Sequence, residues 1–299
     1  MGIPMVRLLG NDCSKYQDVN TTQRKVDFQK MYQAGSRYCF IRATFGNAID
    51  EDFTDYWAAA KAAHMPRGAY GFLTYGTSPE VQAQTFLKCL GNDIGELPLS
   101  ADFEEYEKID GTHTLPPHAA EYLKRYLDVL EKETGKIPFI YTGYYLWLKY
   151  GTPALFWKRY KLWLAAYGTD NPLVPKPWDT MTFHQFGQLD GATFGAESKL
   201  IDANYYFGTQ KDFNNEFCIS IEPPPVIVPP EKPKGLSYSV ISTMNVRKSP
   251  STNSAVVRTL LANDIVIPLD IAGTDSWINI GVDEWVCVEK SGKRYLLKN

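Results

Sequence analysis

Two carboxyl side chains separated by one residue form the clearest chemical motif in this sequence. Asp102 and Glu104 end an apolar stretch and flank Phe103. On a strand, residues i and i+2 point to the same face, so the pattern predicts two neighbouring carboxyl groups with Phe103 on the opposite face. Two such groups disfavour double ionisation, which raises the pKa of one of them. The protonated group could give its proton to a glycosidic oxygen, while its partner stabilises the positive charge that develops on the sugar.

Two more acids, Asp12 and Asp202, also stand at or near the ends of strand-like stretches. In (β/α)-barrels the C-terminal ends of the strands form the active site, so Asp12, Asp102, Glu104 and Asp202 are all candidate catalytic residues. The spacing alone leaves a plain alternative open, in which the acidic pair caps the next helix or faces solvent.

Other chemistries have less support. The histidines have no HExxH or other close metal-ligand spacing, and the five cysteines include no CxxC pair, so we expect neither a metal site nor a cofactor. A cysteine–histidine hydrolase that uses Cys13 or Cys39 with His184 is a weaker alternative, because nothing near either thiol indicates activation. We expect the cysteines to be free and mostly buried.

The elements that would position the acids alternate between strand-like and helix-like stretches over about the first 220 residues, a length typical of a (β/α)-barrel. The predicted strands are residues 38–43, 67–73, 97–104, 137–142, 161–167 and 180–186. The predicted helices include residues 53–64, 79–90 and 117–134, the last of which we expect to stop at Gly135. The predicted fold class is therefore α/β, with a TIM-like (β/α)-barrel and a mostly parallel sheet.

A change of composition marks the end of this domain. Residues 222–234 hold six prolines among thirteen residues, which predicts a polyproline II linker between a catalytic domain at 1–221 and a second domain at 235–299. The second domain has short β-rich stretches without helical periodicity, as expected for a small all-β barrel or sandwich.

Composition excludes some partners. The formal charge is −3 and no basic stripe is present, so we expect no nucleic-acid partner. Every apolar stretch is far shorter than a membrane span, so we expect no membrane insertion.

Aromatic residues are numerous: the 19 Tyr, 15 Phe and 7 Trp fit either a large core or a cleft that stacks sugar rings. Residues 1–7 lack the pattern of a secretory signal, which predicts synthesis in the cytoplasm. The oligomeric state is left open.

Several segments, in order, resemble the glycoside hydrolase family 25 muramidases. The opening Asp12-Cys13-Ser14-Lys15-Tyr16-Gln17 is similar to that family's Asp-x-Ser-x-x-Gln strand, and Asp102-Phe103-Glu104 to its Asp-x-Glu signature. The other matching segments are residues 26–28, 40–44, 67–72, 140–142, 162–167, 183–186 and 201–204.

This resemblance implies hydrolysis of the β-1,4 bond between N-acetylmuramic acid and N-acetylglucosamine in bacterial peptidoglycan, with retained configuration. Glu104 would act as general acid and then base, Asp102 would orient the 2-acetamido group or stabilise the oxocarbenium ion, and Asp12 and Asp202 would tune the pair. The residues expected to contact substrate are Tyr70, Phe72, Tyr141, Trp163, Tyr167, Gln185 and Asn204.

The sequence departs from the family pattern at four positions expected near the cleft. Arg42 stands where Lys is common, Phe45 where Glu is common, Gly71 where His is common and His184 where Trp is common. Substrate contacts at these positions are therefore in question.

The tail resembles a bacterial SH3 (SH3b) domain. Residues 244–252 are similar to its Leu-Asn-Val-Arg-x-x-Pro-Ser opening, and residues 277–280 and 284–286 to its later strands. Such modules commonly bind the cell wall, and seven Lys+Arg against six Asp+Glu in residues 235–299 favour recognition by shape over attraction by charge. A phage endolysin, made in the host cytoplasm and released at lysis, fits this combination. A chitinase-like glycosidase and a non-catalytic wall-binding protein are the alternatives.

Overall fold

The computed structural model describes residues 6–19, 25–105, 115–220, 238–266, 268, 270–272, 277–281, 284–290 and 293–298. The chain forms two compact units, residues 1–226 and 227–299, and each is described by itself. The division falls within the predicted proline-rich linker, and residues 222–234 themselves lie outside the described part of the chain.

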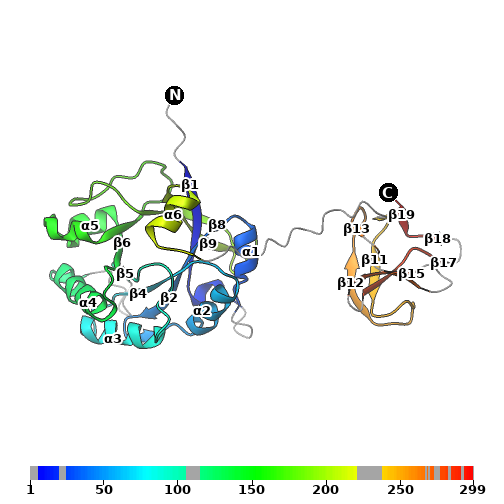
Figure 1. Cartoon of the computed structure of the whole chain (residues 1–299), viewed down its shortest axis with the longest axis horizontal. Helices are drawn as coiled ribbons and strands as arrows, with labels where there is room; N and C mark the ends of the chain where they lie inside the picture. Colours follow the sequence, from blue (N-terminus) through cyan, green and yellow to red (C-terminus); the bar gives the residue numbers. More distant parts are fainter. Residues whose placement is uncertain are drawn as a thin grey trace, which may run out of the picture. The chain divides into compact units, whose positions relative to one another are not determined.

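The first unit is a closed barrel (Figure 1). In sheet order, its strands are β1 (Arg7–Cys13), β9 (Leu200–Phe207), β8 (Phe183–Asp190), β7 (Lys161–Ala165), β6 (Phe139–Gly143), β5 (Ser100–Asp102), β4 (Arg67–Phe72) and β2 (Cys39–Phe45). A parallel pairing of β1 with β2 closes the ring, and the short β3 (Ala48–Ile49) forms a hairpin with β2. The predicted barrel is therefore present.

One strand of the barrel runs against the others. Strand β9 pairs antiparallel with both β8 and β1, whereas the remaining neighbours in the ring are parallel. The reason is the connection: β8 and β9 are joined by a short turn at residues 191–199, and antiparallel neighbours need no crossover helix. The barrel thus departs from a strict TIM-like repeat on this side.

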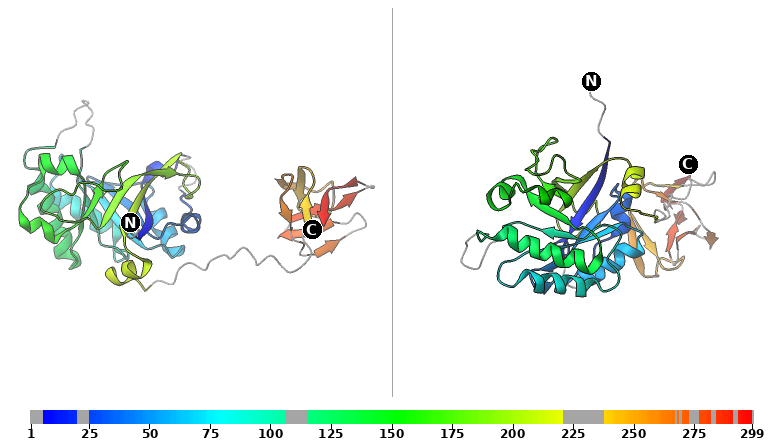
Figure 2. Two further views of the ribbon diagram at one scale, coloured as in Figure 1. Left: turned by 90° about the horizontal axis from the view of Figure 1, so that it is seen from above. Right: turned by 60° about the vertical axis from the view of Figure 1, so that its left-hand side comes forward.

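Helices lie in most of the other connections, whereas residues 166–182 between β7 and β8 form no helix. The helices are α1 (Phe28–Gln33), α2 (Phe53–Ala62), α3 (Pro79–Leu90), α4 (Ala119–Thr134) and α5 (Tyr144–Tyr150), with α6 (Gln210–Glu216) after the last strand and the 3-10 helices η1 (Lys15–Gln17) and η2 (Leu155–Arg159). The right-hand view of Figure 2 shows α3 and α4 side by side in front of the strands. Helix α4 stops at Gly135, whose left-handed φ of 66° confirms the predicted stop.

The inside of the barrel is filled by aromatic side chains. Phe40 stacks on Trp163 with ring centroids 4.4 Å apart, and Phe183 packs edge-on against Phe40 at 5.2 Å. Gly10 lets this core close, because a Cβ there would lie 2.3 Å from the ring of Tyr38. The packed interior supports a cavity at the C-terminal ends of the parallel strands.

The second unit consists of strands in its described residues, with antiparallel pairings throughout. They are β10 (Tyr238–Val240), β11 (Met244–Arg247), β12 (Val256–Leu260), β13 (Ile265–Val266), β14 (Asp270–Ala272), β15 (Trp277–Gly281), β16 (Glu284–Cys287), β17 (Glu289–Lys290), β18 (Lys293–Arg294) and β19 (Leu296–Lys298). Val246, Trp277, Val286 and Leu296 lie in its small core. The β-rich content agrees with the sequence pattern, and the likeness to an SH3b domain stays a prediction.

Candidate active site

A cavity of about 510 Å³ lies where the C-terminal ends of the parallel strands meet. All four predicted acids line it. Asp12 is near the end of β1, Asp102 ends β5, and Glu104 follows two residues later. Although β9 runs the other way, its Asp202 pairs in register with Asp12, which brings it to the same end of the barrel. The fold therefore gathers residues that are up to 190 positions apart (202 − 12) in the sequence.

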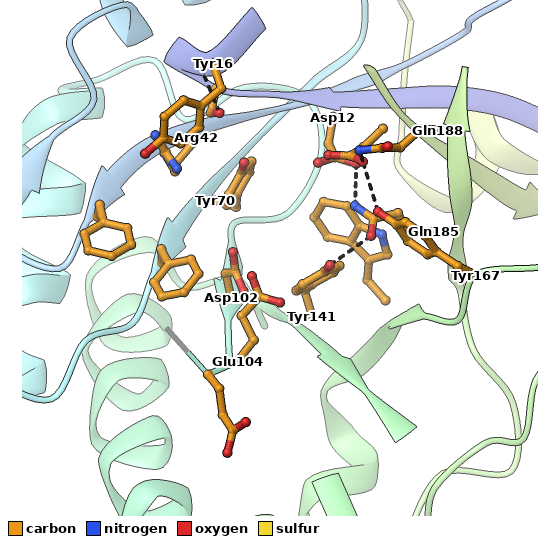
Figure 3. Close-up of a pocket in the computed structure, with 16 residues that line it drawn as sticks. Asp12, Tyr16, Arg42, Tyr70, Asp102, Glu104, Tyr141, Tyr167, Gln185 and Gln188 are labelled. Carbon is orange, nitrogen blue, oxygen red and sulfur yellow. Dashed lines mark hydrogen bonds between the residues drawn. The ribbon is translucent and has the colours of Figure 1, made fainter. Parts of the chain in front are cut away.

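Asp102 and Glu104 lie side by side with their carboxyl groups on the cavity (Figure 3). Strand β5 ends at Asp102, but the chain stays bonded beyond it, because the Phe103 backbone N–H donates to the carbonyl of Tyr141 at 2.9 Å. Phe103 is fully buried on the opposite side, against Trp147. The alternation expected of Asp102, Phe103 and Glu104 is thus present although Glu104 lies outside the strand.

Burial and like charge keep protons on this pair. Burial raises the pKa of Glu104 to about 7, and the charge of Asp202 adds to the shift. The pKa of Asp102 is also raised, first by burial and then by Glu104, while Arg42 acts in the opposite direction. Asp102 Oδ1 is buried and accepts no hydrogen bond from the described residues. The pair therefore offers one acid that is protonated near neutral pH and a second carboxyl group beside it on the cavity.

Asp12 is held by a hydrogen-bonded network beneath the cavity. Its Oδ2 accepts from Gln185 Nε2 at 2.9 Å and from Asn204 Nδ2 at 2.8 Å. Gln185 in turn accepts from the Tyr141 hydroxyl at 2.9 Å, and Asn204 accepts from the Trp163 indole at 2.7 Å. Burial, followed by the charge of Asp202, raises the pKa of Asp12 to about 8, and the two amide bonds partly offset this. Asp12 is thus fixed in position and largely neutral at pH 7.

Asp202 is tied to the rim on the same side. Its Oδ1 accepts from the Tyr167 hydroxyl at 2.9 Å and from Gln188 Nε2 at 3.0 Å, and its backbone carbonyl accepts from Asn11 Nδ2 at 2.9 Å. These bonds set its carboxylate facing Asp12 and Glu104, whose pKa values it raises.

The predicted substrate contacts fall into two groups. Tyr70, Phe72, Tyr141, Trp163, Tyr167 and Gln185 line the cavity. Asn204 does not, because it is fully buried under Asp12, where it orients that acid. Trp163 reaches the cavity from the aromatic core and is almost fully buried, so it forms part of the floor.

Four further residues line the cavity that the sequence did not predict there: Ser14, Tyr16, Glu105 and Gln188.

The four departures from the family pattern divide into two pairs. Arg42 and Phe45 line the cavity, but Gly71 and His184 do not. The cause is the alternation of side chains along a strand. Tyr70 and Phe72 face the cavity, so Gly71 between them faces Tyr126 of α4 on the other side of the sheet. A Cβ atom on residue 71 would lie 2.2 Å from the Tyr126 hydroxyl oxygen. His184 likewise points away and bonds the carbonyl of Ala166 at 2.8 Å.

Arg42 is held beside the acids by an ion pair. Its Nε and Nη2 both lie 2.8 Å from Asp50 Oδ2, and both side chains are buried. The guanidinium lies under the ring of Tyr16, 5.0 Å from its centroid, and Phe45 stacks on Phe72 at 4.6 Å next to it. Figure 3 shows Tyr16 and Arg42 on the side of the cavity away from Gln185 and Tyr167, with Asp102 and Glu104 between the two sides.

The described residues hold neither a candidate metal centre nor a candidate membrane-spanning helix. No group of three or more His, Cys, Asp or Glu residues there has a geometry that could hold a metal ion. In the same part of the chain, none of the helices combines the length and the apolar character that a membrane span needs.

Comparison with known proteins gives consistent matches to the first unit. Residues 17–191 match the sequence model of "Glycosyl hydrolases family 25". An Escherichia coli K12 protein, YegX, is 30% identical over 202 residues, covering 65% of this chain and 70% of YegX. An N,O-diacetylmuramidase from Arthroderma benhamiae is 29% identical over 191 residues, covering 62% and 80% of the two chains. The structure of a muramidase from Trichobolus zukalii aligns with a TM-score of 0.58 at 25% identity, over 70% of this chain and 98% of its own.

Proposed function

Because the chain belongs to family 25 of the glycosyl hydrolases, we propose that it is a peptidoglycan hydrolase that cleaves the β-1,4 bond between N-acetylmuramic acid and N-acetylglucosamine. The family membership makes the chain a glycoside hydrolase, and the muramidases among its relatives support peptidoglycan as the substrate. The observation that carries the proposal is the placement of Asp102 and Glu104 side by side in the cavity, with burial raising the pKa of Glu104 to about 7.

In the first step, protonated Glu104 gives its proton to the glycosidic oxygen. The bond from C1 to that oxygen breaks, and its electron pair leaves with the N-acetylglucosamine hydroxyl. Glu104 suits this role because a general acid works best when its pKa lies close to the working pH. Its side chain is longer and less buried than that of Asp102, so it reaches further into the cavity.

Asp102 would assist at the sugar itself. Its carboxyl group lines the cavity, where it can accept a hydrogen bond from a substrate acetamido N–H. The oriented acetamido oxygen, or the carboxylate directly, then stabilises the positive charge at C1. The N–H donor, the developing charge and nearby Arg42 all favour the ionised form of Asp102 at this stage.

In the second step, water attacks C1 and returns its proton to Glu104, which restores the acid and gives retained configuration. Asp12 and Asp202 stay beside the pair as groups that set its protonation. Tyr70, Tyr141 and Tyr167 offer aromatic and hydroxyl surface for the flanking sugars.

The identity of the new chain ends tests the bond that is cut. Purified peptidoglycan is digested, reduced with borohydride and analysed by mass spectrometry. Muramic acid at the new reducing ends is expected. Glucosamine at those ends would favour the chitinase-like alternative, and an absence of new ends would overturn the proposal.

The role in a cell is also part of this proposal. We assign residues 235–299 as an SH3b-like wall-binding domain and the protein as a phage endolysin that reaches the wall when the host membrane is opened. The near-balanced charge of the tail supports recognition by shape. Produced in a susceptible bacterium, the protein should cause lysis after membrane permeabilisation. Failure to lyse permeabilised cells would contradict this role.

A further inference from the structure

The charge of the cavity is very uneven. Its described lining holds five carboxyl groups, those of Asp12, Asp102, Glu104, Glu105 and Asp202. Within the same set of described residues, Arg42 is the one cation. Among these residues, Arg42 is therefore the group that can offer a charged hydrogen-bond donor to a ligand oxygen.

Arg42 lines the cavity, and its ion pair does not use all of its hydrogen-bond donors. Its bonds to Asp50 use Nε and Nη2, and in the described part of the chain no hydrogen bond from Nη1 to protein is formed. Asp50 is itself fixed, since its Oδ1 accepts from the Asp52 backbone N–H at 3.2 Å and its Oδ2 from that of Lys15 at 3.3 Å. The guanidinium is thus held rigidly, which lowers the entropic cost of binding an oxygen ligand.

Apolar surface adjoins this cation. Phe45 and Phe72 are register partners at the ends of β2 and β4, and their rings stack at 4.6 Å with an interplanar angle of 24°. Phe72 is mostly buried, whereas Phe45 is 38% exposed. Arg42 lies 6.0 Å from the centroid of Phe45. A short apolar group that carries a carbonyl or carboxylate could touch both features at once.

We infer that Arg42, Phe45 and Phe72 form a subsite for the lactyl ether of muramic acid, with the methyl group on the stacked rings and the carboxyl oxygens on the guanidinium. This inference rests on the proposed function, because it takes muramic acid to be the sugar next to Asp102 and Glu104. N-acetylglucosamine has no lactyl group, so the subsite gives the enzyme its preference for muramic acid over glucosamine at this position.

Two matched substrates test the inference. One is peptide-free glycan with the lactyl carboxylate intact, and the other is the same glycan with that carboxyl reduced to an alcohol. Full-length wild type should show a kcat/KM about tenfold or more higher on the intact glycan, the scale of a charge-assisted hydrogen bond. A ratio near one for wild type would overturn the inference.

Variants assign the preference to Arg42. Arg42→Met combined with Asp50→Asn removes the cation without leaving a buried charge, and the ratio should fall to within about threefold of one. Arg42→Lys keeps the charge and should retain most of the preference. Because a ratio is measured within one protein sample, partial unfolding does not obscure it. An unchanged ratio in the double variant would overturn the inference.

A second set of variants tests the apolar half of the subsite. Phe45→Ala should raise KM on both glycans by about three- to tenfold, since both retain the methyl group. Phe156→Ala is the matched control, because Phe156 is 42% exposed and lies outside the cavity lining. Equal kinetics of these two variants would contradict a role for the ring of Phe45.

The carboxylate could instead come from a stem peptide. If so, free stem peptide added at millimolar concentration should inhibit cleavage of peptide-free glycan, and that result would overturn the lactyl assignment. We expect no such inhibition, because the lactyl group belongs to the glycan itself. Failure of the proposed function looks different, since wild type would then release no muramic acid ends from any glycan.

Discussion

The indole N–H of Trp163 donates to Oδ1 of Asn204 at 2.7 Å and so fixes which end of the Asn204 amide faces Asp12. An indole nitrogen can only donate, so Asn204 must turn its oxygen toward Trp163 and its Nδ2 toward Asp12. Asp12 Oδ2 then accepts at 2.8 Å. A residue of the aromatic core thus sets the bonding of an acid at the active site.

Replacing Trp163 with Phe tests this relationship. The variant keeps the aromatic packing but releases the Asn204 amide, so kcat/KM should fall by about three- to tenfold. Weaker bonds to Asp12 should also move the pKa of that acid above its value of about 8, visible as a shift in the pH profile. Trp157→Phe is the control, because it loses an indole bond to Thr152 away from the cavity. The same kinetics and pH profile in both variants would contradict a positioning role for Trp163.

The pH dependence of activity follows from the raised pKa of Glu104. The general acid must carry a proton, and its pKa of about 7 means that the proton is lost as pH rises through neutrality. We expect kcat/KM on soluble glycan fragments to decline above about pH 7. A profile that stays flat from pH 6 to about pH 9 would show that Glu104 is not the titrating acid.

Stability should respond to pH in the same range. Folding raises the pKa of Glu104 from its ordinary 4.5 to about 7, so the folded protein binds more protons than the unfolded chain between these values. The contribution of Glu104 to the free energy of unfolding is fully present below about pH 4.5 and is lost as pH rises through about 7. Glu104→Gln cannot ionise, so its free energy of unfolding should exceed that of wild type by about 1–3 kcal/mol at pH 8.5 and match it near pH 4. Denaturant titrations at both pH values check this, and a difference independent of pH would contradict it.

The sequence predicted the parts of this architecture that depend on local patterns. The spacing of Asp102, Phe103 and Glu104 predicts which side chains share a face, and Gly135 predicts the end of α4, because both follow from local backbone geometry. The direction of β9 was not predicted, since hydrophobic pattern alone does not distinguish a parallel from an antiparallel neighbour.

Predictions of the site were least accurate for residues that act through long-range packing. Tyr16 lies over Arg42 because η1 is tied to the segment after β3, with Lys15 Nζ bonded to Glu51 at 3.0 Å. Nothing local in the sequence indicates that contact. Asn204 was expected at the substrate and instead lies beneath Asp12, because its position on β9 faces the barrel interior.

The second unit should matter for whole cells more than for the reaction itself. A chain ending at residue 222 should cleave soluble wall fragments at the wild-type rate but clear intact cells far more slowly. Engagement of two modules typically raises the effective affinity by about 10²- to 10⁴-fold. Turbidity assays on intact cells, alongside reducing-end release from fragments, give the comparison. Equal clearing by both chains would argue against a wall-binding role for residues 235–299.

The role of Glu104 as general acid is tested most directly by the rate of Glu104→Gln on purified peptidoglycan, measured by the release of reducing ends at pH 6. Glu105→Gln is the matched comparison, because the Glu105 carboxylate pairs with Lys149 at 3.4 Å. We expect Glu104→Gln to fold like wild type and to lose about 10²- to 10⁴-fold in kcat, with a far smaller loss for Glu105→Gln. A correctly folded Glu104→Gln protein that turns over within about threefold of wild type would contradict this role.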